Sequence, residues 1–364
     1  MGSAAARPPV QSAKHTGPTS GVRDAVSKHY KAAIIGCGNI SRIHADGYKG
    51  EPRCRLVALA DIKREAAEKL AAEKGLSPAI YTDYREMLRR EKPDIVSVCL
   101  WPALHLPAVR DCVEAGVAAV HCEKPMAPTW GESLELAALA GKGTQLSFNH
   151  QRRFTRGLLQ AKRLLDEGVF GALERMDLFP FANLLDVGTH LVDIAFMFNN
   201  ECPVKWVIGQ VDAREVRTWF GVPFEFMAVG FIRYENGVRG FIHAGDDKEM
   251  GTGLRLVGSK GFIELEWEGA CRRAAVYADP GFRVPALEEP DPMPAVMGNI
   301  VDCLESGKEP EQRAERALRV AEVIFAVYES SRRRARIDLP LGPKDSAFLS
   351  MLKNGEIGPS PSTR

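Results

Sequence analysis

The sequence predicts an α/β protein in which a parallel sheet, covered by helices on both sides, is followed by a second, α+β domain. Three observations lead to this prediction. The chain has 364 residues, whereas one domain usually takes about 100 to 200. Short apolar runs alternate with segments of helical period up to about residue 150. Beyond that point, hairpin signals separate the apolar runs.

The first domain is expected at residues 30–150. Apolar runs predict strands at 31–35, 55–60, 95–100, 118–122 and 145–148. Helical periodicity predicts helices between them at 63–74, 84–91 and 105–115, and a fourth beginning at Thr129. Gly75 closes the first of these helices and Asp83 caps the second. Strands that are apolar on both faces and alternate with helices indicate a parallel sheet.

The second domain is expected at residues 151–340. Helices are predicted at 157–167 and 187–198, and a strand is predicted between them at 173–179. Strand pairs at 226–234 and 238–244, and at 254–257 and 262–267, flank glycine-containing turns and predict antiparallel hairpins. A proline-rich connector at 279–294 leads to two closing helices at 295–305 and 312–333.

Both ends of the chain are predicted to lie outside these domains. Residues 1–29 are rich in Pro, Gly, Ser, Ala and charge without apolar periodicity, so we expect a flexible arm. Residues 341–364 are polar and contain proline, so we expect a tail.

Composition restricts the class of partner. Lys plus Arg number 48 and Asp plus Glu number 47, so neither nucleic acid nor an anionic membrane is an expected partner, and a small molecule is. The eight cysteines show neither a C-x-x-C pair nor zinc-site spacing, so we expect no metal site and reduced thiols. The sequence contains no apolar run of membrane-spanning length and its N-terminus lacks the apolar core of a signal peptide. We therefore expect a cytoplasmic protein.

The first predicted strand runs into Gly36-Cys37-Gly38-Asn39-Ile40-Ser41 and then a helical segment, which is the setting of a dinucleotide-binding turn. Gly36 permits the tight turn, and Gly38 lets the backbone approach a pyrophosphate that the N–H groups of the helix start can bind. Ser41 replaces the usual third Gly or Ala but is small. Taken alone the motif is weak, because glycine-rich turns also serve purely structural needs.

Asp61 ends the next predicted strand, 23 residues after Gly38. A carboxylate at this position can accept hydrogen bonds from the adenosine ribose and would repel a 2′-phosphate, which favours NAD. The alternative is an Asp that only caps the following helix. Lys63 and Arg64 follow closely, so NADP remains possible as the cofactor.

Two further segments carry candidate catalytic groups. The fourth strand ends in Glu123-Lys124-Pro125, at the carboxyl edge where open α/β sheets bind ligands. Lys124 can stabilise an alkoxide there, or be a solvated surface lysine beside a turn. On the predicted helix 187–198, Asp186, His190 and Asp193 fall within a ~60° stripe opposite an apolar face. This stripe predicts an acid–base pair, and the alternative is a helix cap beside a structural histidine.

These motifs, in this order and spacing, resemble the Gfo/Idh/MocA family, named for glucose-fructose oxidoreductase, inositol dehydrogenase and a rhizopine catabolism protein. The resemblance covers about residues 31–340 and rests on four segments: Gly36-Cys37-Gly38-Asn39-Ile40, Asp61, Glu123-Lys124-Pro125 and Asp186-x-Gly188-x-His190-x-x-Asp193. It implies a Rossmann domain followed by an open-faced, largely antiparallel sheet that makes subunit contacts in a dimer or tetramer. It also implies hydride transfer between a nicotinamide and a secondary hydroxyl or ketone of a sugar, glycoside or cyclitol.

The resemblance assigns roles to particular residues. His190 would be the base, Asp186 would orient it, and Lys124 would stabilise the alkoxide-like oxygen. Arg153 and Asp193 would complete the substrate site. The expected cofactor contacts come from the glycine-rich turn, the second strand and the loops after the third and fourth strands: Gly36, Gly38, Asn39, Ile40, Asp61, Lys63, Trp101, Pro102, His105 and Glu123. A cis peptide bond is expected before Pro125.

One departure from the family pattern affects the expected substrate. Only 17 residues separate Gly168 from Asp186, and the segment 179–185 replaces the glycine-rich stretch that many relatives carry there. The pocket is therefore expected to be open, which favours a glycoside or conjugated sugar. Two other functions stay open at this point: a glycosidase that retains its NAD and acts through a transient keto-sugar, and a cofactor-binding sensor without turnover.

Overall fold

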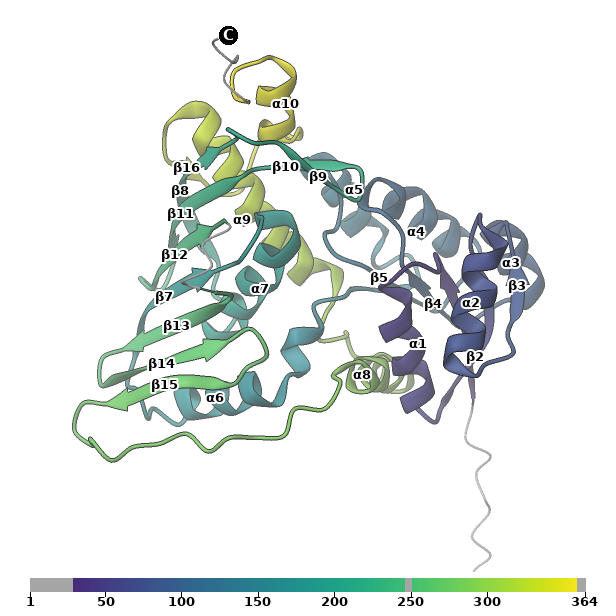
Figure 1. Cartoon of the computed structure of the whole chain (residues 1–364), viewed down its shortest axis with the longest axis horizontal. Coiled ribbons are helices and arrows are strands. Elements are labelled where there is room, and N and C mark those ends of the chain that lie inside the picture. The colour runs from purple at the N-terminus through teal and green to yellow at the C-terminus, as the bar shows by residue number, and fades with distance from the viewer. Residues whose placement is uncertain (1–28, 246–250, 359–364) are drawn as a thin grey trace, which may run out of the picture.

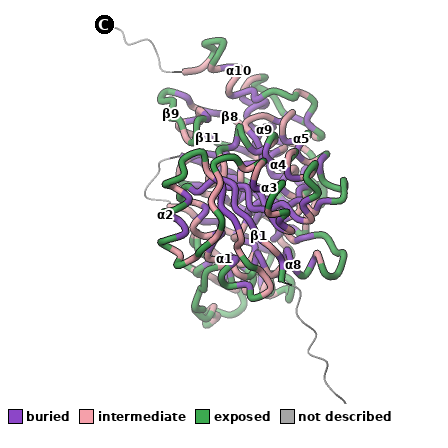
Figure 2. The backbone as a smooth tube through the Cα atoms, turned by 90° about the vertical axis from the view of Figure 1, so that its right-hand side faces the viewer, coloured by how far each residue is buried: buried purple, intermediate pink, exposed green. Residues whose placement is uncertain are grey.

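The computed structural model describes residues 29–245 and 251–358 of the chain. Two domains lie side by side, each built around one large sheet (Figure 1). Buried strands form the centre of the first domain and more exposed segments surround them (Figure 2). All but the last residue of the predicted arm lies outside the described residues. Within the described ranges, no helix has both the length and the apolar character needed to cross a bilayer.

The first domain contains six parallel strands in the order β3-β2-β1-β4-β5-β6, which confirms the predicted parallel sheet. Their bounds are β1 Tyr30–Ile35, β2 Cys54–Ala60, β3 Ala79–Tyr81, β4 Ile95–Val98, β5 Ala119–Cys122 and β6 Gln145–Phe148. The sequence did not indicate β3, because it has three residues at the sheet edge and none of them is buried. Such a strand has no apolar run to detect.

Helices cover both faces of this sheet. One face packs against α1 (Ser41–Gly50), α2 (Arg64–Lys74) and α8 (Met293–Ser306). The other face packs against three helices: α3 Tyr84–Glu91, α4 His105–Glu114 and α5 Trp130–Leu139. The predicted caps Asp83 and Thr129 accept hydrogen bonds from the first turns of α3 and α5.

The helix α8 is predicted as part of the second domain, but it lies against the first domain. It packs so closely on α1 that a Cβ added at Gly47 would lie 3.1 Å from Met293, and one added at Gly50 would lie 2.6 Å from Pro294. The sequence did not predict this contact, because an apolar helix face does not specify which sheet it will cover.

The second domain contains an eight-stranded mixed sheet in the order β15-β14-β13-β7-β12-β11-β8-β16. Only β7 and β12 pair in parallel, so the sheet is largely antiparallel as expected. Its strands are β7 Leu173–Phe179, β8 Val204–Asp212, β11 Met227–Tyr234, β12 Arg239–Ala244, β13 Gly253–Gly258, β14 Gly261–Glu266, β15 Cys271–Val276 and β16 Ile337–Asp338. The helices α6 (Arg156–Asp166), α7 (Thr189–Phe198) and α9 (Ala314–Arg333) lie on one side of it (Figure 1).

Several elements of the second domain were not predicted, namely β8, β15 and β16, a small hairpin and one helix. A small hairpin of β9 (Arg217–Trp219) and β10 (Val222–Phe224) follows β8 and reaches toward the first domain (Figure 1). The helix α10 (Ala347–Lys353) lies within the segment expected to be a tail, and its Phe348 packs against Tyr328 of α9. The hairpin and α10 are both short, so their apolar residues do not form a detectable period.

Candidate active site

The dinucleotide-binding turn lies between β1 and α1. Gly36 has a φ of +89°, and a Cβ added there would lie 2.4 Å from the carbonyl oxygen of Cys99, so only glycine fits. By contrast, a Cβ added at Gly38 would meet nothing within 4 Å among the described residues. The backbone at Gly38 therefore faces open space, as close approach of a pyrophosphate requires. The hydroxyl of Ser41 donates a hydrogen bond to the Gly38 carbonyl, so this departure supports the turn.

Asp61 is joined to the same turn. Its carboxylate accepts hydrogen bonds from the backbone N–H groups of Cys37 and Lys63, each at 2.8 Å. Each oxygen thus has a remaining acceptor position at the edge of the cofactor site. The side chain of Lys63 is exposed, and Arg64 pairs with Glu68 at 3.3 Å. The residues Asn39 and Ile40 follow Gly38 and lead into α1.

The loops after β4 and β5 meet through His105. Its Nδ1 lies 3.1 Å from the carbonyl oxygens of Pro125 and Met126, and its Nε2 lies 2.9 Å from that of Leu100. His105 is fully buried, so it links the two loops and does not face a cofactor as expected. Trp101, in contrast, is 57% exposed. Pro102 is buried and begins the short helix Pro102–Leu104, which directly precedes α4.

Glu123 is a buried anion that links three elements. Its carboxylate accepts hydrogen bonds from Nε2 of His44 and Nδ2 of Asn149, both at 2.7 Å, and from the Lys124 N–H at 3.1 Å. Burial raises the pKa of Glu123, but the hydrogen bond and charge of His44, with Lys124 and Asn149, outweigh it and lower this pKa to about 2. Glu123 is 4% exposed and positions Lys124 through its hydrogen bond with the Lys124 N–H, and its contact with the cofactor stays a prediction.

Lys124 and Asp186 form an ion pair where the two domains meet. The Lys124 Nζ lies 2.5 Å from Oδ1 of Asp186, and the two side chains are 11% and 24% exposed. The peptide bond from Lys124 to Pro125 is cis, as the family resemblance implied. Asp186 lies in a π-helical turn, Leu184–Gly188, that Asn183 caps by accepting the Asp186 N–H. The α-helix begins only at Thr189, so Asp186 and His190 do not lie on one regular helix and the predicted stripe is wrong. Asp186 instead contacts Lys124.

His190 is buried beside this ion pair. Only 4% of the residue is exposed, and its Nδ1 has no hydrogen-bond partner within the described residues. The rings of His150 and Trp267 stand edge-on to it, at centroid distances of 5.6 and 5.3 Å. Burial lowers the pKa of His190 well below 6.5, and the positive charge of Lys124 lowers it further. The imidazole is therefore neutral near pH 7.

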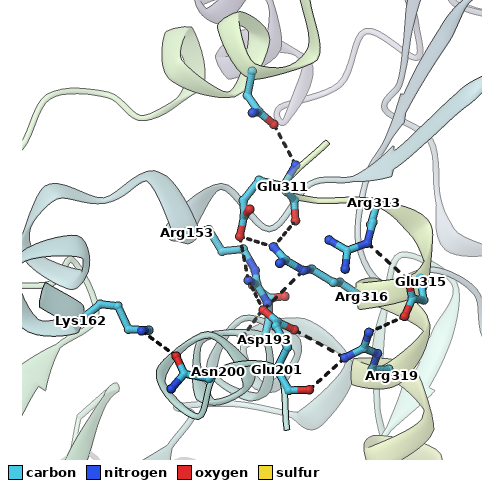
Figure 3. A network of polar contacts seen from close by, with 11 residues as sticks. Arg153, Lys162, Asp193, Asn200, Glu201, Glu311, Arg313, Glu315, Arg316 and Arg319 are labelled. Carbon is cyan, nitrogen blue, oxygen red and sulfur yellow. Dashed lines mark hydrogen bonds and ion pairs between the residues drawn. The ribbon is translucent and has the colours of Figure 1, made fainter. Parts of the chain in front are cut away.

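Arg153 and Asp193 form a buried ion pair with each other. The Arg153 Nε lies 2.8 Å from Oδ2 of Asp193, and each side chain is 1% exposed. Arg153 also pairs with Glu201 and Glu311, in a network that joins α7 to the start of α9 (Figure 3). Their expected substrate contacts stay a prediction, because in this arrangement both side chains are occupied by this network. Every residue of α7 is buried, so a polar stripe on this helix needs partners inside the protein.

Comparison with known proteins identifies the family. Residues 30–150 match the NAD-binding Rossmann domain of an oxidoreductase family, and residues 179–339 match the C-terminal alpha/beta domain of the same family. The chain belongs to the Gfo/Idh/MocA family. It is accordingly an NAD-binding oxidoreductase of the sugar and cyclitol dehydrogenase type.

Individual Gfo/Idh/MocA relatives share this architecture at modest identity. D-apiose dehydrogenase of Paraburkholderia graminis is 24% identical over 368 residues, which cover 91% of this chain and 95% of the relative. D-glucoside 3-dehydrogenase of Escherichia coli is 32% identical over 190 residues, which cover 46% of this chain and 54% of the relative. The solved structure of an aldose-aldose oxidoreductase from Caulobacter crescentus, complexed with glycerol, has a TM-score of 0.76 at 21% identity and covers 86% of this chain and 100% of its own.

The Gfo/Idh/MocA motifs identified Lys124, Asp186 and His190 as residues of one site. Several other residues of this site were not identified from the sequence. His150 lies two residues after the end of β6, and Trp267 directly follows β14. Trp219 lies in the small hairpin, with its ring centroid 4.9 Å from the Lys124 ammonium. Trp219 and Trp267 belong to no motif that we used, whereas His150 lies in the run that supplied Arg153. The run from Asn149 to Phe154 was a usable signal, because it follows the carboxyl end of a predicted strand.

Proposed function

We propose that the protein oxidises a secondary hydroxyl of a sugar, glycoside or cyclitol with NAD, and that the same groups serve the reverse ketone reduction. The observation that carries the proposal is the Lys124–Asp186 ion pair beside a buried, neutral histidine. A fixed cation next to a neutral imidazole combines a group that stabilises a developing alkoxide with a group that accepts a proton. The eight free thiols fit a reducing compartment, and we place the protein in the cytoplasm.

NAD would be held by the glycine-rich turn, with Gly38 against the pyrophosphate and Asp61 on the adenosine ribose. When bound, it supplies the hydride acceptor, C4 of its nicotinamide. This assignment fits the open space at Gly38 and the positive φ of Gly36. The exposed Trp101 lies in the loop after β4, at the carboxyl edge where the cofactor would extend.

In the proposed mechanism, His190 accepts the proton of the substrate hydroxyl. Its lowered pKa keeps it unprotonated near pH 7, which is the form a base needs. The Lys124 ammonium donates a hydrogen bond to the oxygen as negative charge develops there. Asp186 holds the ammonium in place and does not orient His190, which revises the role expected for it. The Glu123 carboxylate accepts a hydrogen bond from the backbone N–H of Lys124 and so holds this residue in position.

The proposed activity is tested by offering the purified protein sugars, their glycosides and inositols with NAD or NADP, and following absorbance at the NADH band. Lys124→Ala and His190→Ala should each lower turnover by about 100-fold or more and leave NAD affinity nearly unchanged. Glu288→Gln, at an exposed position without a described partner, is the matched control. Near-normal turnover in both active-site variants would refute the assigned roles. Release of free sugar without net NADH would instead indicate an NAD-retaining glycosidase.

We further propose that the protein is a homo-oligomer. Its subunits would meet through the face of the mixed sheet opposite to α6, α7 and α9. Apolar side chains on this face are partly exposed: Ile208 by 45%, Val229 by 42% and Phe241 by 40%. Such contiguous apolar exposure is typical of a subunit contact. Light scattering should show a dimer or tetramer, and Val229→Lys should reduce its mass. Leu287→Lys, an exposed leucine in the connector, should leave the mass unchanged.

A further inference from the structure

Three aromatic rings from both domains gather above the Lys124–Asp186 pair. We call residues 217–224, which comprise β9, its turn and β10, the aromatic hairpin. The rings of Trp219 and Phe220 have centroids 4.3 Å apart, and Phe220 lies 6.3 Å from Trp101 of the first domain. The Lys124 ammonium lies 4.9 Å from the Trp219 ring centroid. The hairpin therefore places an aromatic surface directly beside a proposed catalytic group.

This surface is exposed, although large aromatic side chains are usually buried. Trp101 is 57% and Phe220 is 47% exposed. Trp219 itself packs against a mostly apolar set of residues from both domains: Pro102, Pro125, Pro128, Asn183, Leu185, Val222 and Phe224.

The backbone of the hairpin also holds Phe220 in an unusual conformation. Trp219 pairs with Val222, so Phe220 and Gly221 form a two-residue turn, with φ values of +44° and +76°. Turns of this kind favour Asn or Gly at the first position, and an aromatic residue there costs conformational energy. Since this fold does not need an aromatic ring at an exposed turn, the ring at this position points to a role in binding.

The hairpin is attached firmly to the catalytic region. Glu225 directly follows β10 and is fully buried. Its Oε1 accepts the N–H of Leu184, at 2.7 Å, and its Oε2 accepts the hydroxyl of Tyr328, at 2.8 Å. Leu184 begins the turn that carries Asp186. The aromatic surface and the Lys124–Asp186 pair are therefore held in a fixed relation.

From these contacts we infer that the aromatic hairpin selects glycosides with an apolar aglycone, an inference that rests on the proposed function. A sugar hydroxyl bound to the Lys124 ammonium must approach the indole of Trp219, because the two groups are in contact. The C–H face of a sugar ring is apolar and packs well on an aromatic face. An aglycone attached to that ring then lies against Phe220, the exposed ring at the tip of the hairpin.

The test measures kcat and KM for glucose, galactose and mannose and for their phenyl glycosides, with NAD. We expect kcat/KM to be at least about 10-fold higher for a phenyl glycoside than for its free sugar, since apolar contacts of this size discriminate by roughly that factor. Phe220→Ala should remove most of this preference by raising KM for the phenyl glycoside, with kcat/KM for the free sugar changed by less than about 3-fold. Trp219→Ala should raise KM for both, and Trp219→Phe should restore much of the loss.

Two controls separate this inference from the proposed function. Tyr277→Ala removes another exposed aromatic ring, 64% exposed and remote from Lys124 in the second domain, and should change neither constant. Equal kcat/KM for free sugars and phenyl glycosides, or a preference that survives Phe220→Ala, would overturn the inference while leaving the dehydrogenase activity intact. If the unmodified protein oxidises no member of the panel and no sugar, glycoside or inositol of the broader screen, the proposed function fails and this inference fails with it.

Discussion

Replacing Glu225 by Gln should make the protein more stable above neutral pH. Burial raises the pKa of this carboxyl from its ordinary 4.5 to about 7, although the Leu184 N–H and the Tyr328 hydroxyl partly oppose the shift. The folded protein therefore binds the proton more tightly than the unfolded chain. Between pH 4.5 and 7 its stability falls as pH rises, and above pH 7 the loss is complete. Because one pKa unit corresponds to about 1.4 kcal/mol, the loss is about 3 kcal/mol.

The glutamine keeps an oxygen for the Leu184 N–H and carries no charge, so it resembles the protonated acid. Urea unfolding of both proteins at pH 5, 6, 7 and 8, followed by circular dichroism, measures the effect. We expect similar midpoints at pH 5 and a higher midpoint for Glu225→Gln at pH 8. Glu288→Gln, at an exposed position, should follow the unmodified protein throughout. The reasoning is refuted if the stability difference between Glu225→Gln and the parent is the same at every pH.

Three further predictions concern the site. Asp61→Ala should weaken NAD binding more than NADP binding in fluorescence titrations, and tighter NADP binding by the unmodified protein would contradict the ribose assignment. Asp193→Ala should lower the free energy of unfolding by about 3 to 5 kcal/mol, because it leaves Arg153 buried without its main partner. The KM should stay the same, and a changed KM at unchanged stability would indicate a substrate role for Asp193. Turnover should be constant from pH 8 to 6 and fall only below that, where His190 becomes protonated, and a decline that begins above pH 6.5 would argue against His190 as the base.

The parallel sheet and the order of its helices could be predicted because they depend on local patterns. An apolar run bounded by a glycine or a capping residue specifies a strand or helix without reference to the rest of the chain. The predicted strand 145–148 and helix 84–91 coincide with β6 and α3 for this reason. The placement of Lys124 and Asp186 in one site was also predictable, but only through the family resemblance.

The partners of individual side chains were not predictable. The helical-wheel argument for Asp186, His190 and Asp193 assumes one regular helix with one open face, and neither condition holds. The π-turn shifts Asp186 toward Lys124, and complete burial of α7 directs Asp193 to Arg153. The partner of each charge is thus decided by elements far away in the sequence, which a local pattern does not contain.

The position of α8 has a consequence for how this protein is made. The groove between α1 and the first sheet is filled by a helix that begins at Met293, so the cofactor domain is completed by residues synthesised long after its own strands. Until α8 has left the ribosome, Ala45 and Tyr48 on α1 lack part of their packing. Incomplete domains with exposed apolar surface are prone to misassembly during synthesis. The packing of the cofactor domain is therefore complete only after the chain has been synthesised to the end of α8.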